Sequence, residues 1–109
     1  MGVDYGWKKL YSAVHYAVAS EEQLQKRLTS CLVVIHHLGR ESFPDDQTWA
    51  QFSSLLEAST NQPARYEGEG AIHATTSQMT DEEAGRYLRE ICSLFSAVTM
   101  AYGKDSSIH

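Results

Sequence analysis

The sequence has little of several features that would place it in a special class of protein. It contains only two cysteines and two prolines among 109 residues, and its longest purely apolar run extends from Cys31 to Ile35. A membrane-spanning helix needs about 20 such residues, so no transmembrane segment is expected. The cysteines lack metal-type spacing and lie in apolar stretches, where we expect both to be reduced and buried in the core. The first residues do not resemble a signal peptide, and we therefore expect a cytoplasmic protein.

Positive charge is also scarce, and it is unevenly distributed. The formal net charge is −5, with a balance of +2 over residues 1–40 and −7 over residues 41–109. Proteins that bind nucleic acid typically show a basic excess or a basic stripe, so nucleic acid is not an expected partner. The division of charge would suit contact between the two halves of neighbouring chains, or an acidic half that binds a basic partner. A solvated surface is the simpler interpretation.

Helical periodicity, in contrast, is present over most of the chain. Apolar residues at spacings of three and four predict four helices, at about 4–19, 21–38, 45–58 and 81–103. Capping boxes at 20–23 and 80–83 mark two of the starts, and Gly39 and Gly103 are predicted to end the helices that follow them. The expected fold is all-α. It is a four-helix bundle with three long helices and one shorter one, forming a single domain over residues 1–103 with a frayed tail at 104–109.

A long polar segment precedes the last of these helices. Residues 59–79 are rich in Gly, Ser, Thr, Asn and Gln, and we expect them to form a loop. A loop of that length in a compact domain is usually functional or disordered. Its most distinctive stretch supplies a cation, an aromatic ring, two carboxylates and an imidazole, from Arg65, Tyr66, Glu67, Glu69 and His73. Two interpretations remain open: these residues bind a ligand, or Tyr66 and Ile72 merely pin the loop to the bundle.

The histidines are the other candidates for a site. His36 and His37 are adjacent, so on a helix their side chains project about 100° apart and do not easily join one tight site. One hypothesis is that the 65–73 loop covers the bundle with His36 or His37 beneath it. The helical metal motifs Glu-x-x-His and His-Glu-x-x-His are both absent from the sequence. Nucleophile and nucleotide-binding motifs are missing as well, so no catalytic residue, metal or cofactor is predicted.

A row of mostly small residues on the last predicted helix indicates close helix packing, and it consists of Gly85, Arg89, Ser93, Ala97 and Ala101. On the first helix Trp7, Tyr11 and His15 form an aromatic stripe, which is more typical of a core or interface than of a base-stacking surface.

These patterns favour a non-enzymatic helical module that acts by protein contact, either as a self-associating homodimer or as a subunit of a larger assembly. Two alternatives remain. One is a helical binding protein or enzyme that binds a small ligand or metal through the 65–73 loop and the histidines of the second predicted helix. The other is an acidic regulator of a basic partner.

Overall fold

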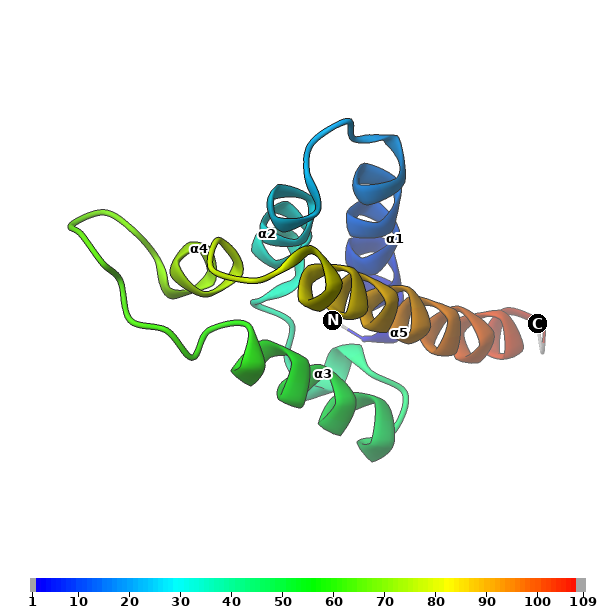
Figure 1. Cartoon of the computed structure of the whole chain (residues 1–109). Coiled ribbons are helices and arrows are strands. Elements are labelled where there is room, and N and C mark those ends of the chain that lie inside the picture. The colour runs from blue at the N-terminus through cyan, green and yellow to red at the C-terminus, as the bar shows by residue number, and fades with distance from the viewer. Residues whose placement is uncertain (1, 108–109) are drawn as a thin grey trace.

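The computed structural model describes residues 2–107, except for the side chains of residues 105–107, and this part of the chain is helical with no strand (Figure 1). The all-α prediction is confirmed. A short helix, α4, lies within the segment that was expected to be a loop. The elements are α1 (Val3–Ala19), α2 (Leu24–Ile35), the 3-10 turn η1 (Arg40–Ser42), α3 (Asp46–Ala58), α4 (Ala71–Thr76) and α5 (Asp81–Ser107).

The core forms where α1, α2, α3 and α5 meet. Helix α1 packs against both α2 and α5, and α5 also contacts α2 and α3, so α5 joins the other long helices (Figure 1). Each helix contributes apolar residues at the spacings expected for one buried face. The largest fully buried apolar side chains are Leu10, Leu28, Leu32, Ile35, Phe52, Ile91, Leu94 and Val98.

Side-chain caps determine where α3 and α5 begin. The Oδ1 atom of Asp45 accepts a hydrogen bond of 2.8 Å from the amide of Thr48. At α5 the Thr80 hydroxyl accepts from the Glu83 amide at 3.1 Å, and the Glu83 carboxylate accepts from the Thr80 amide at 2.9 Å. The capping box predicted at 80–83 is therefore confirmed.

The prediction of a capping box at 20–23 is wrong. The Ser20 hydroxyl accepts from the amide of Glu22, two residues on, which makes a local turn instead of starting a helix. Helix α2 begins only at Leu24, and it ends at Ile35 rather than continuing to Gly39. Residues 36–37 form a turn there, after which Leu38 returns to the core.

Helix α5 is longer than expected, because Gly103 does not end it. Among the described residues, Gly68 has a positive φ and Gly103 does not. Gly103 therefore lacks the left-handed conformation that would stop a helix. The helix continues to Ser107 through most of the tail predicted to fray, and residues 108–109 lie outside the described residues. No helix among the described residues is both long and apolar enough to cross a membrane.

Candidate functional site

Helix α4 is attached to the long helices mainly through α2, which it packs against. The hydroxyls of Thr29 on α2 and Thr76 on α4 lie 2.6 Å apart and share a hydrogen bond. The amide side chain of Gln25 donates to the carbonyl of Met79 at 3.0 Å, just after α4. These contacts place α4 beside α2, and the connector from α3 to α4 extends away from the core (Figure 1).

The connector is closed by a cluster of hydrogen bonds between Arg65 and Glu69. The Oε1 atom of Glu69 accepts from the Arg65 amide at 2.8 Å and from the Arg65 Nε at 3.2 Å. The Oε2 atom accepts from the Arg65 guanidinium at 2.6 Å, and that guanidinium also donates to Ser77 at 2.8 Å. Gly68 allows the chain to turn between the two residues, because its φ of 92° is one that other residues rarely adopt. We call this arrangement the Arg65–Glu69 clip.

His73 is the third member of this cluster. Its Nδ1 atom lies 2.7 Å from Oε2 of Glu69, whose side chain is fully buried. The hydrogen bond from the Arg65 side chain is the main reason that the pKa of Glu69 falls to about 2, and the Arg65 amide and His73 lower it further against the opposing effect of burial. Glu69 is therefore ionised at neutral pH and can only accept, so Nδ1 of His73 donates. The Nε2 atom of the ring remains for another partner.

His73 also lines a groove between α2, α3 and α4, with a volume of about 450 Å³. We call it the α2–α4 groove. Its wall is mostly apolar, and Val33 of α2 leaves 56% of its surface exposed there. The lining residues are Thr29, Val33, His36, Leu56, Thr60, Gly70, Ala71, Ile72 and His73.

The structure therefore brings together four of the residues that the sequence singled out. Arg65, Glu69 and His73 form one cluster, and His36 lies with His73 on the groove. His37 lies elsewhere, since its Nε2 is 2.8 Å from the hydroxyl of Tyr5 on α1.

The remaining loop residues behave differently. Tyr66 is 59% exposed and Glu67 is exposed, and neither lines the groove. Of the two residues proposed to pin the loop, Ile72 packs against the core and Tyr66 does not contribute to it.

Sequence reasoning missed the apolar part of the site. Val33 and Leu56 lie within the helices predicted at 21–38 and 45–58, and their positions there do not mark them as part of a site. One signal was present: Val33 lies in a run of apolar residues too long for a single buried face, so at least one of them had to face outward. The polar half of the site was easier to recognise because its residues lie close together in the sequence.

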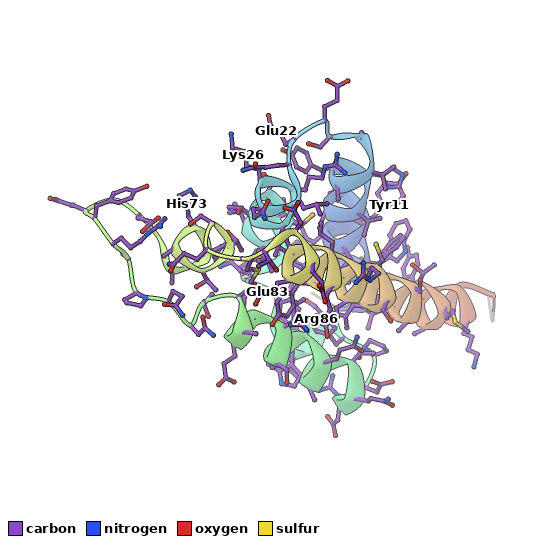
Figure 2. All side chains as sticks on the ribbon, in the orientation of Figure 1. Tyr11, Glu22, Lys26, His73, Glu83 and Arg86 are labelled. Atoms are coloured by element: carbon purple, nitrogen blue, oxygen red, sulfur yellow. The ribbon has the colours of Figure 1, made fainter. Side chains whose placement is uncertain are left out.

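The predicted interface residues are divided between the interior and the surface. The indole of Trp7 donates to the Thr99 hydroxyl at 2.9 Å and stacks on Tyr102, so this residue packs within the molecule. The ring of Tyr11 stacks on that of His15, with 3.9 Å between the ring centroids. Tyr11 lies on the far side of α1 from His73 (Figure 2).

On α5 the predicted row is only partly covered. Its exposed members are Arg89 and Ser93, and its half-buried members are Gly85, Ala97 and Ala101. Cys92, on the same helix, is exposed, so the expectation that both cysteines are buried holds only for Cys31. Burial is the main reason that the pKa of Cys31 rises to about 11.

Among the described residues, no three or more His, Cys, Asp and Glu side chains are grouped so as to hold a metal ion. None of the protein-family models, curated proteins or solved structures compared with this chain matches it.

Proposed function

We propose that this protein binds a small, mainly apolar molecule in the α2–α4 groove. The observation that carries the proposal is the coincidence of an apolar groove of about 450 Å³ with two histidines, one of which is oriented by a buried, ionised carboxylate. Small-molecule sites are typically concave, mostly apolar and 300–1,000 Å³ in volume, with a few polar groups that fix the ligand's orientation.

The exposure of Val33 supports this proposal. A large apolar side chain that stays half exposed in a groove loses part of the free energy that burial would provide, at about 25 cal/mol per Å². A ligand that covers Val33, Leu56 and Ile72 recovers that free energy. The hydrogen bonds of the Arg65–Glu69 clip order one side of the groove before a ligand arrives, which lowers the entropic cost of binding.

The test is a titration of the protein with naphthalene-1-carboxamide, a neutral and mostly apolar probe, followed by ¹H–¹⁵N NMR. We expect saturable shifts of the amides that line the groove. Ala71→Trp fills the groove from its α4 side and should weaken binding by about tenfold or more, because the bulky ring occupies the ligand's space.

The matched control is Ala50→Trp, which places the same ring on an exposed alanine of α3 outside the groove lining. It should leave binding unchanged. Shifts that map to another part of the molecule, or an Ala71→Trp variant that binds as well as the wild type, would contradict the proposal.

Self-association through α5 is a second candidate function. It is favoured by Met100, which is 70% exposed and lies on the same face of α5 as Ser93 and Ala97. An apolar side chain exposed beside small residues is typical of a helix–helix contact between copies. The third hypothesis, an acidic regulator of a basic partner, remains a prediction from the charge distribution alone.

A further inference from the structure

We propose that the ligand of the α2–α4 groove is a small organic acid, with an apolar body against α2 and α3 and a carboxylate bound by His36 and His73. This inference rests on the proposed function. It starts from the charges available in the groove, whose lining includes two histidines and no acidic side chain. The charge that its walls can present to a ligand is therefore positive, although the whole chain has a net charge of −5.

The donor of His73 follows from the hydrogen bond on the other side of its ring. Because Nδ1 donates to Glu69, Nε2 is the ring atom left to meet a ligand. A protonated ring at this position offers an Nε2–H donor to the ligand. Hydrogen bonds between such a cation and a carboxylate are roughly twice as strong as neutral ones.

Glu69 does not repel an anionic ligand, because Arg65 neutralises its charge. Both carboxylate oxygens accept hydrogen bonds from Arg65, and the side chain is fully buried. Ser77 accepts from the same guanidinium and helps to hold it in place. Arg65 and Glu69 thus act as positioning residues, which set the orientation and tautomer of the ring that contacts the ligand.

The charged side chains nearest to His73 on neighbouring segments do not oppose the binding of a carboxylate. Beyond His73, the side chains of Glu22 in the turn before α2, Lys26 on α2 and Tyr16 on α1 line a second recess. Figure 2 shows Glu22 and Lys26 on the same side of the molecule as His73. The Nζ atom of Lys26 lies 3.6 Å from Oε2 of Glu22, so the two charges largely cancel.

The experiment compares three probes that share one apolar body: naphthalene-1-carboxylate, naphthalene-1-carboxamide and 1-naphthylmethylammonium. Dissociation constants come from ¹H–¹⁵N NMR titrations of the full chain near pH 6. We expect the carboxylate to bind about tenfold more tightly than the carboxamide, the size of a charge-assisted hydrogen bond, and the ammonium to bind most weakly. Equal affinity for carboxylate and carboxamide would overturn the acid preference and leave the proposed function intact. Absence of groove shifts with all three probes would overturn both.

Two neighbouring residues provide a matched pair of variants. His36→Gln should reduce the preference for the carboxylate, because it removes a group that lines the groove. His37→Gln removes the next imidazole along the chain, which pairs with Tyr5 instead, and should keep the preference. If both variants lose the preference for the carboxylate equally, that preference reflects the general charge of the protein and not recognition by His36.

The positioning role of Glu69 has its own readout in the imidazole ¹⁵N shifts of His73. In the wild type these should report a proton on Nδ1, and Glu69→Gln should weaken that preference together with the preference for the carboxylate. His73→Gln should abolish the carboxylate preference while the carboxamide still binds. A Glu69→Gln variant with an unchanged tautomer and unchanged carboxylate affinity would rule out the positioning role.

Discussion

The Glu69 carboxylate organises the connector between α3 and α4 from a fully buried position. It accepts three hydrogen bonds from Arg65 and one from His73. A buried carboxylate is stable only when its charge is paired and its oxygens are hydrogen-bonded, and both conditions are met here. The structure of the connector therefore depends on whether this one group is ionised.

This dependence predicts a response to acid. Because the pKa of Glu69 is lowered from 4.5 to about 2, its contribution to stability is fully present above pH 4.5 and is lost as the pH falls toward 2. The NMR signal of the Arg65 amide should therefore keep its folded position to about pH 3 and then shift with a midpoint near pH 2. Glu69→Gln should remove this transition. A midpoint near 4.5 in the wild type would mean that the clip does not hold the ionised form.

At the scale of the helices, two glycines differ in how closely a neighbouring element approaches them, although only Gly85 belongs to the row of small residues that predicted close packing. A Cβ atom added to Gly6 of α1 would overlap the carbonyl oxygen and Cβ of Ser42 in η1. The same atom on Gly85 of α5 would meet only the flexible end of Arg89 at 3.4 Å and Leu24 at 3.9 Å. Gly6, and not Gly85, is where the absence of a side chain lets two elements approach.

Alanine at these two positions should therefore have opposite effects. Gly6→Ala is expected to destabilise the protein by about 1–3 kcal/mol, because the backbone of η1 must move. Gly85→Ala should stabilise it by about 0.5–1 kcal/mol, because alanine is the better helix former and meets no rigid neighbour. Urea denaturation measures both free energies of unfolding. A change of the same sign in both variants would contradict this account.

Some patterns of neighbouring residues were predictable from the sequence, whereas the capping box at 20–23, the helix end at Gly103 and the contacts between distant segments were not. The Thr80–Glu83 box and the buried face of α5, with Ile91, Leu94 and Val98, follow from local spacing. The Arg65–Glu69 clip was foreseen only as a cluster of residue types, because its geometry requires the turn at Gly68. The contact of Gly6 with Ser42 and the choice of His36 over His37 depend on tertiary packing, which no local pattern specifies.

For the molecule as a whole, self-association is the property that the exposed face of α5 predicts. Sedimentation velocity over a range of concentrations should show a dimer, and Met100→Glu should shift it toward monomer without loss of helix content. The control is Val18→Glu, since Val18 is also apolar and exposed but lies at the end of α1. A wild-type protein that stays monomeric, or a Met100→Glu variant that dimerises normally, would exclude this face.

The segment that forms the site contributes little to the core. Between Leu55 and Ala84 the buried apolar residue is the small Ala74, while Arg65, Glu69 and His73 all lie in that interval. Each of these three residues is four positions from the next, so the clip needs no distant partner to form. Substitutions of Arg65, Glu69 or His73 are therefore expected to change the chemistry beside the groove and to leave the packing of the long helices intact. The connector and the core are thus separate in their demands on the sequence, so the residues of the clip are free to vary in evolution without repacking of the long helices.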